Sequence, residues 1–571
     1  MKIIKYLISA LYIFLLCFVA GCVDLDYSEV TTDDEAWVYA SPTNGIQRLV
    51  TDIYAQIPFD FGYFDGAMLS SASDESDYAR SLSNIHKFYN GAWSTINPFD
   101  STWRNSYSAI AEANIFLEKI GKISLDEYKY SGIAYDIMKA KFEKFPYEVR
   151  FLRAYFYFEL AKTYGDVPLV TKSLTAEEAN NVSRTPVKDV FQFIVDECDA
   201  IAQYLPITYA AEPSQETGRA SRPMALALKA RTLLYAASPL FNPSNDAELW
   251  HKAAAANKAV LDNAATWGIS LGAYSALWGD QSFLNPEIFF IRPAGNSQED
   301  SGWGNNFERY NFPVGVENGN SGNCPTQSLV DAYEYKSTGI SFGDTWNGSV
   351  NVTAENPYSG LDPRFGLTVV KNGDSWPVYN SLPIETFEGG LNASPLYGAT
   401  TTGYYLKKYC DQGVYITTNY TTAARHSWIV FRLSEFYLNY AEAVYNYLKN
   451  ADATNAEFSL SANAAINVLR DRPDVMMPHF SGNGNFTERY TRERMVELAF
   501  EGHRFWDVRR WKKGNDFFTN VKVAKITKDG SGNVILQRDV KTRLWDEKYN
   551  LFPIPFTEMQ KNHNLTQNAG W

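Results

Sequence analysis

RERMVELAFEGHRFWDVRRW, residues 492–511, is the stretch of this chain that says most about its fold. Met495, Leu498 and Ala499 recur at the three- and four-residue spacing that gives a helix one apolar face. Gly502 can supply the left-handed residue that ends such a helix. A second short helical turn is expected after it, with large side chains at Phe505, Trp506, Val508 and Trp511.

Charged residues are interleaved with these apolar side chains. Glu501 stands three residues before Arg504, and Asp507 three before Arg510, so both pairs lie within helical reach. Planar guanidinium groups stack on aromatic rings and also pair with carboxylates. The run therefore predicts a structural junction of packed rings and ion pairs.

Two functional interpretations of the same run are weaker. Glu497 and Glu501 lie one helical turn apart, but the carboxylate pair of a glycoside hydrolase flanks a cleft and usually comes from different elements. The neighbouring arginines make an ion-pair network the simpler account. A nucleic-acid surface is also disfavoured, because the run is as acidic and aromatic as it is basic.

The run resembles the C-terminal signature of the SusD/RagB outer-membrane nutrient-binding lipoproteins of Bacteroidetes. The chain's end, LFPIP at residues 551–555 and NLTQNAGW at 564–571, resembles that family's closing motif. EVRFLRAYFYFELAKTYGDVPLV at 148–170 resembles another of its patterns, so the resemblance covers essentially the whole mature chain. The chain also resembles the family in three shorter runs: PTQSLVDAYE at 325–334, LDPRF at 361–365 and TTGYYLKKY at 401–409.

Composition narrows the possible partners. The 571 residues carry a formal net charge of −13, which argues against nucleic acid and against an anionic membrane surface as partners. Aromatic residues make up 15% of the chain; they usually pack cores, but flat rings also stack on the apolar faces of sugars.

No recognisable chemistry emerges from the motifs. HExxH, P-loop and GxGxxG patterns are absent, and the six histidines are scattered without metal-ligand spacing. We therefore expect no enzyme activity, no cofactor and no metal. The five cysteines (Cys17, Cys22, Cys198, Cys324 and Cys410) show no paired spacing, and we expect the last three to be free and buried.

The N-terminal residues indicate where the protein is located. Lys2 and Lys5 precede an apolar run over residues 6–19, as in a secretory signal peptide. The small residues that lead into Cys22 resemble a bacterial lipobox, in which the cysteine carries lipid and anchors a soluble body to a membrane. We expect a signal peptide at 1–21 and a lipid-anchored tether at 22–40. Asp24 and Asp26 resemble an export signal, so we expect an outer-membrane protein that faces the cell exterior.

The expected fold class is mainly α: degenerate tetratricopeptide-like helical hairpins with a large loop-rich insertion that contains short β-strands. We expect a helical scaffold at 41–264 with a ligand loop at about 59–100, the insertion at 265–425, and C-terminal helices with a closing segment at 426–571. Helices are expected at 42–54, 103–120, 147–160, 187–204, 224–237, 250–263, 428–447 and 462–470, and strands at 287–291 and 404–409.

The resemblance implies a role. Such lipoproteins capture oligosaccharides, sometimes peptides, and act as a hinged lid over a SusC-like TonB-dependent outer-membrane transporter. A peptide-binding lid and a helical array that only binds other proteins are the alternatives. No fixed motif carries the ligand contacts, so we expect them among polar-flanked aromatic residues and their neighbours in the two long loop regions. These are Tyr78 and Trp93 with Asp74 and Arg80, then Trp303, Tyr310 and Trp346 with Asn305.

Overall fold

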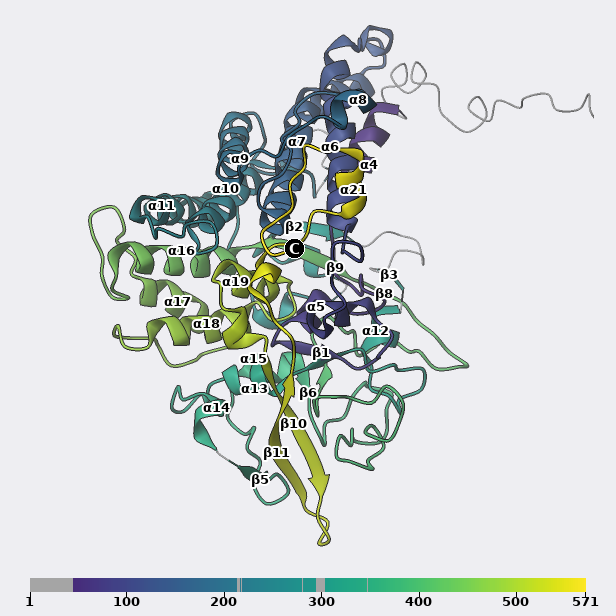
Figure 1. Ribbon diagram of the computed structural model, residues 1–571, viewed down its shortest axis with the longest axis vertical. Coiled ribbons are helices and arrows are strands. Elements are labelled where there is room, and N and C mark those ends of the chain that lie inside the picture. Colours follow the sequence, from purple (N-terminus) through teal and green to yellow (C-terminus); the bar gives the residue numbers. More distant parts are fainter. Residues whose placement is uncertain are drawn as a thin grey trace, which may run out of the picture.

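The computed structural model describes residues 45–571 apart from 213–215, 217, 280, 294–302, 305 and 347. The expected signal peptide and tether lie outside the described residues. Within the described part helices predominate, and the strands, most of them short, form small sheets of two or three strands. The predicted mainly α fold is confirmed (Figure 1).

An array of consecutive helices forms the scaffold. Its members pack in chain order, each against the next (Figure 1). They are α6 (Ser101–Lys119), α7 (Ile133–Tyr164), α9 (Val187–Ala202), α10 (Arg222–Ala237) and α11 (Ala247–Ala264), with α4 (Gln47–Ala55) against α6 and α7. The predicted helix at 147–160 is only part of α7, because the chain stays helical through Pro146 and buries Phe145 and Met138 before it.

The array resumes after the insertion. α16 (Leu433–Leu448) packs on α11, and α17 (Ala462–Arg470) packs on α16. An antiparallel pair, β2 (Ile288–Pro293) with β9 (Ser427–Arg432), joins the chain on either side of most of the expected insertion. The predicted helix at 428–447 was therefore wrong at its start. Residues 427–432 are all buried and rich in aromatic and β-branched side chains, which suit a strand covered on both faces.

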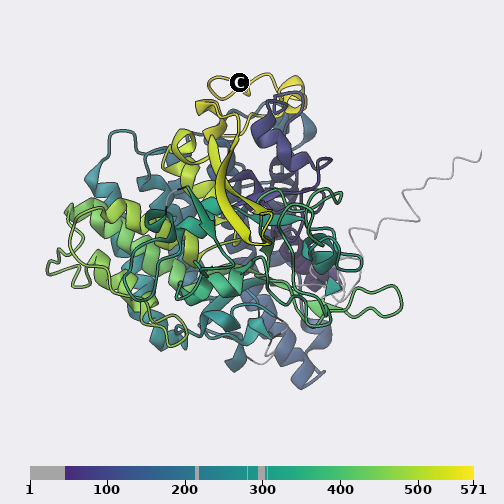
Figure 2. The ribbon, with the colours of Figure 1, turned by 90° about the horizontal axis from the view of Figure 1, so that it is seen from below.

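Short elements separate long loops through the rest of the insertion (Figure 2). They include β3 (Trp303–Gly304), α12 (Asn306–Asn311), β4 (Asn323–Pro325), α13 (Gln327–Ala332), α14 (Phe342–Thr345), β5 (Ser349–Asn351), α15 (Pro363–Thr368), β6 (Val369–Val370), β7 (Tyr405–Leu406) and β8 (Ala424–Arg425). Between α4 and α6 lie η2 (Leu69–Ala72), β1 (Ser76–Tyr78) and α5 (Lys87–Asn90). The predicted strand at 404–409 shortens to β7.

The C-terminal elements close the structure. They are α18 (Phe486–Glu497), α19 (His503–Arg510), α20 (Gly514–Phe517), β10 (Asn520–Lys528), β11 (Val534–Thr542) and α21 (Phe556–Lys561). β10 and β11 form a long hairpin that projects from the body (Figure 1), and β5 pairs with the outer side of β11.

The helix of the terminal run ends earlier than predicted. α18 stops at Glu497, and Gly502, in the left-handed region at φ 77°, begins α19 instead of ending α18. The backbone carbonyl of Glu497 accepts a bond of 2.6 Å from the Arg432 guanidinium. A side chain thus satisfies one of the carbonyls that a helix leaves unpaired at its end.

A buried ion network surrounds Glu497. Its carboxylate accepts from Arg364 at 2.7 Å, Arg432 at 2.7 Å and Arg472 at 2.8 Å, and all four side chains are buried. The three arginines come from α15, from β9 and from the turn after α17. The network therefore fixes the insertion and the array against the terminal run.

One of the two predicted charge pairs forms, and the other does not. Asp507 does bind Arg510, at 2.9 Å. Glu501 does not bind Arg504; it pairs instead with Arg432 and Lys408, each at 2.7 Å. Because Glu497 and Glu501 are both buried in these pairs, neither carboxylate is presented to a substrate.

Replacing Glu497 by Gln should lower the free energy of unfolding by about 3–5 kcal/mol, because it leaves three buried guanidinium groups short of one charge. Chemical unfolding followed by circular dichroism at pH 7 measures the change. Glu488→Gln, on the same helix but exposed, is the control and should shift stability by less than about 1 kcal/mol. A Glu497→Gln variant that unfolds at the wild-type denaturant concentration would show that the network adds nothing.

Candidate functional site

Strand β1 joins two surfaces. It pairs with β4 through the whole of its length, from Ser76 opposite Pro325 to Tyr78 opposite Asn323. Asp74 precedes the strand and Arg80 follows it. Since an extended chain advances about 3.3 Å per residue, these two predicted site residues lie at opposite ends of the strand.

Arg80 contributes to an open surface, which we call the Arg80 platform and define as Arg80, Asn320 and Tyr397. The Arg80 Nη1 donates to the Asn320 Oδ1 at 3.0 Å. Its guanidinium carbon lies 5.5 Å from the centre of the Tyr397 ring, and Tyr397 is 67% exposed. The platform therefore combines an accessible ring with a guanidinium and an amide.

Short-range contacts hold the platform in place. The Nε2 of His86 donates to the carbonyl oxygen of Arg80 at 2.9 Å. The backbone N–H of Asn320 donates to the carbonyl of Arg309 in α12, also at 2.9 Å. Sequence reasoning missed Asn320 and Tyr397, because neither stands in a motif and their proximity to Arg80 depends on the folded loops.

Further exposed aromatic surface adjoins the loop that carries Asn320. The side-chain amide of Asn318 donates to the carbonyl of Ile416 at 2.5 Å, which fixes the 415–420 turn beside this loop. Tyr415 in that turn stacks on Tyr379, with ring centres 4.8 Å apart, and Tyr420 is 59% exposed. The loop thus links the platform to a second group of rings.

Tyr78 and Tyr310 are brought together behind Gly66. Tyr78 is buried and donates its hydroxyl to the carbonyl of Asp65 at 3.0 Å, while Tyr310 is half-buried. A Cβ at Gly66, whose φ is +92°, would lie 2.3 Å from the Tyr78 hydroxyl and 2.9 Å from the Tyr310 ring. Only glycine allows this close approach. Tyr78 is therefore part of the support and is not presented to solvent.

Trp93 is a correction to the predicted site. It is 2% exposed and packs on Phe88, on Phe552 at 4.7 Å and on Trp571 at 4.8 Å between ring centres. The closing segment of the chain covers it, so in this conformation Trp93 is a core residue.

Asp74 is held in an ion pair. It is buried and receives two bonds of 2.8 Å from the Arg504 guanidinium. Trp346 is half-buried beneath Arg538, whose guanidinium carbon lies 4.1 Å from the ring centre. Trp303 belongs to β3, and Asn305 lies outside the described residues.

No cluster of three or more His, Cys, Asp or Glu side chains in the described part of the chain is arranged to hold a metal ion. None of the helices described here combines the length and the apolar character needed to cross a bilayer. Cys198, Cys324 and Cys410 are free and buried, as predicted.

Comparison with known proteins gives consistent matches along the chain. A model described as the SusD family matches residues 286–571, and one described as "Starch-binding associating with outer membrane" matches 43–234. The chain is 25% identical over 483 residues to SusD-like protein P2 of Formosa agariphila, covering 82% of this chain and 79% of that protein. SusD-like protein P25 of the same organism is 23% identical over 554 residues, covering 90% and 88%.

Solved structures share the fold. A SusD-like protein from Bacteroides fragilis superposes with a TM-score of 0.76 at 25% identity, covering 95% of this chain and 99% of that one. A SusD-like carbohydrate-binding protein from the same organism gives 0.73 at 25% identity, covering 93% and 100%. A laminarin-binding SusD-like protein gives 0.63 at 22% identity, covering 92% and 99%, and shows the fold alone.

Glu75, between Asp74 and β1, should make stability depend on pH. It is 1% exposed, and burial raises its pKa to about 8. The folded state therefore keeps a proton that the unfolded chain loses near its ordinary pKa of about 4.5. The stability that depends on this Glu75 proton is fully present below the ordinary pKa and is lost as the pH rises through about 8. Glu75→Gln should thus be a few kcal/mol more stable than wild type at pH 8 and nearly equal to it at pH 4. Chemical unfolding at both pH values checks this, and parallel pH profiles for the two proteins would contradict it.

Proposed function

Because this chain belongs to the SusD family, we propose that it is a cell-surface lipoprotein that captures oligosaccharides and delivers them to a partner SusC-like TonB-dependent outer-membrane transporter, acting as its lid. The proposed capture site is the Arg80 platform. The single observation that carries this assignment is the exposed Tyr397 ring beside the Arg80 guanidinium and the Asn320 amide.

Sugar recognition needs this combination of groups. The C–H faces of a pyranose ring pack on aromatic faces, and its hydroxyls exchange hydrogen bonds with guanidinium and amide groups. Arg80 keeps donors beyond the one that it gives to Asn320, since a guanidinium carries five N–H groups. The neighbouring Tyr415 and Tyr420 rings offer further surface to a longer chain.

The comparisons support a glycan over a peptide ligand. One solved relative at 25% identity is a carbohydrate-binding protein, and a matching family model is described as starch-binding. A peptide-binding lid remains the second candidate, because the same guanidinium and amide would also bind peptide carbonyls.

The proposed lid role is supported by the separation of the helical array from the loops of the insertion. Figure 1 shows the helices α7, α9 and α10 in the upper half of the view, and α13, α14 and β6 of the insertion in the lower half. A rigid helical surface suits broad packing on a partner, while loops on a different face hold ligand.

Tyr397→Ala should weaken oligosaccharide binding about fivefold or more while leaving the melting temperature nearly unchanged, because the loss of one stacked ring costs roughly 1 kcal/mol. Isothermal titration with the neutral oligosaccharides that a glycan array selects measures the change. Tyr130→Ala is the matched control, since Tyr130 is 89% exposed and also lies beside a cation, Lys129 at 5.2 Å.

Three outcomes would favour another function. Retention of peptides but not sugars points to a peptide-binding lid. Binding of the transporter alone, with neither ligand class retained, points to an interaction subunit. Release of reducing ends from oligosaccharides by the purified protein would show that it is a glycoside hydrolase.

Cys22→Ala should move the protein from the membrane fraction to the soluble fraction, because we propose that lipid on Cys22 is the anchor. Fractionation followed by immunoblotting measures this, and Cys17→Ala is the control. A Cys22→Ala protein that stays with the outer membrane would place the anchor elsewhere.

A further inference from the structure

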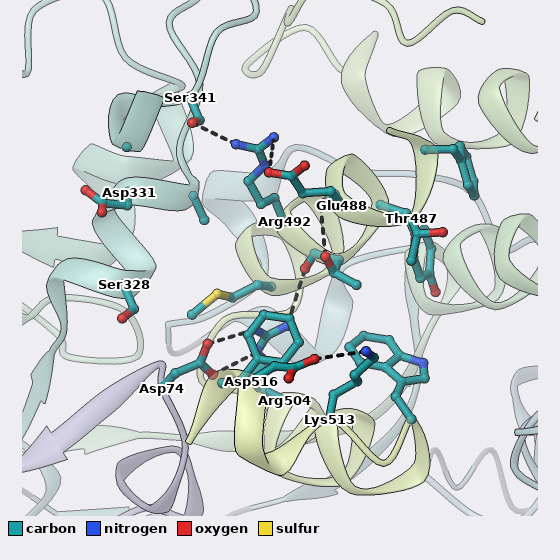
Figure 3. Close-up of a pocket in the computed structure, with 18 of the residues that line it drawn as sticks. Asp74, Ser328, Asp331, Ser341, Thr487, Glu488, Arg492, Arg504, Lys513 and Asp516 are labelled. Atoms are coloured by element: carbon teal, nitrogen blue, oxygen red, sulfur yellow. Dashed lines mark hydrogen bonds and ion pairs between the residues drawn. The ribbon is translucent and has the colours of Figure 1, made fainter. Parts of the chain in front are cut away.

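A cleft lies at the Asp74 end of β1, away from the Arg80 platform. It has a volume of about 700 Å³, within the range of roughly 300–1,000 Å³ that small-molecule sites span. One wall comes from α16, α18, α19 and α20, and the other from α13, α14 and β10 (Figure 3).

The two walls are joined at Arg492. This side chain leaves α18 and bonds to the Ser341 hydroxyl, just before α14, at 2.8 Å (Figure 3). It also bonds to the Asp344 carboxylate, within α14, at 2.8 Å. It also pairs with Glu488 at 3.2 Å on its own helix. The width of the cleft is therefore set by a bridge between its walls, and the cavity is built into the fold.

The charged side chains of the cleft are paired with one another or with close neighbours. Lys513 binds Asp516 at 2.9 Å, and Arg504 binds Asp74 through two bonds of 2.8 Å (Figure 3). Asp331 is paired with Arg538 at 2.9 Å. A charged ligand would compete with the pairs that already neutralise these groups, which favours an uncharged ligand.

Aromatic surface lines the same space. Trp511 and Phe517 are half-buried, and the guanidinium carbon of Arg504 lies 4.4 Å from the centre of the Phe517 ring. The indole N–H of Trp511 donates to Glu442 at 2.7 Å, so the orientation of that ring is fixed. Flat apolar faces therefore stand beside carboxylate oxygens.

We propose that this cleft is a second binding site, for an uncharged carbohydrate. Paired carboxylates still have lone pairs that accept from sugar hydroxyls, because each carboxylate offers about four acceptor sites. The exposed Thr487 hydroxyl and the half-buried Ser328 hydroxyl add neutral polar contacts at the rim. Trp511 and Phe517 supply surfaces on which a sugar ring packs. The proposal stands on the cleft's own residues and goes beyond capture at the Arg80 platform.

The test removes the platform first. A protein with Arg80→Ala and Tyr397→Ala is titrated with maltohexaose and with laminarihexaose by isothermal calorimetry. Residual binding in this background should fall at least fivefold when Thr487→Trp fills the cleft or Phe517→Ala removes its ring. Asn515→Trp is the control, because Asn515 is exposed on α20 but does not line the cleft. Thr487 is also exposed, so its variant keeps the test valid should Phe517→Ala fail to fold.

The outcomes separate the two sites. Loss of all binding in the platform variant, with wild type binding at one site only, overturns the cleft and leaves the platform. Unchanged binding in the platform variant, abolished by Thr487→Trp, supports the cleft and overturns the platform. Retention of an acidic hexasaccharide in the cleft, with both neutral sugars excluded, overturns the assigned ligand class.

Discussion

The structure depends on the pairing of the Glu497 carboxylate with Arg364, Arg432 and Arg472. Buried charges are costly unless they are paired and hydrogen-bonded, so such a cluster tolerates few alternative arrangements. Although burial alone would raise the pKa of Glu497, the three arginines hold it well below its usual range. The carboxylate therefore stays ionised across the physiological range. Segments far apart in sequence are joined at this one point, and the loop-rich insertion is fixed on the helical array through it.

The positions of the two proposed ligand surfaces, the Arg80 platform and the cleft, depend on that junction. α19 follows the network directly and carries Arg504, which binds Asp74 just before β1. Within β1, Asp77 is held by Arg543 at 2.7 Å and Lys541 at 2.6 Å. A strand fixed in this way presents Arg80 at one end and Asp74 at the other. The platform and the cleft therefore share one support, although their surfaces are chemically different.

The helices were predictable because their apolar spacing is local, whereas the site depends on distant contacts. Trp93 and Tyr397 both stand in polar loops, and nothing nearby in sequence tells the packed ring from the exposed one. Trp93 is buried by Phe552 and Trp571, which lie more than 450 positions later in the sequence. Likewise Arg504 bonds to Asp74, 430 positions earlier, in preference to Glu501 three residues before it. The strand at 427–432 was missed because its apolar run continues into the pattern of α16.

The central claim is tested most directly by a crystal structure. Crystals of the protein are soaked with a neutral oligosaccharide that a glycan array selects. The account predicts a pyranose ring packed on the Tyr397 face, with hydroxyls within about 3 Å of the Arg80 guanidinium and the Asn320 amide. Sugar density on another face, with the Arg80 platform bare at saturating ligand, would contradict it.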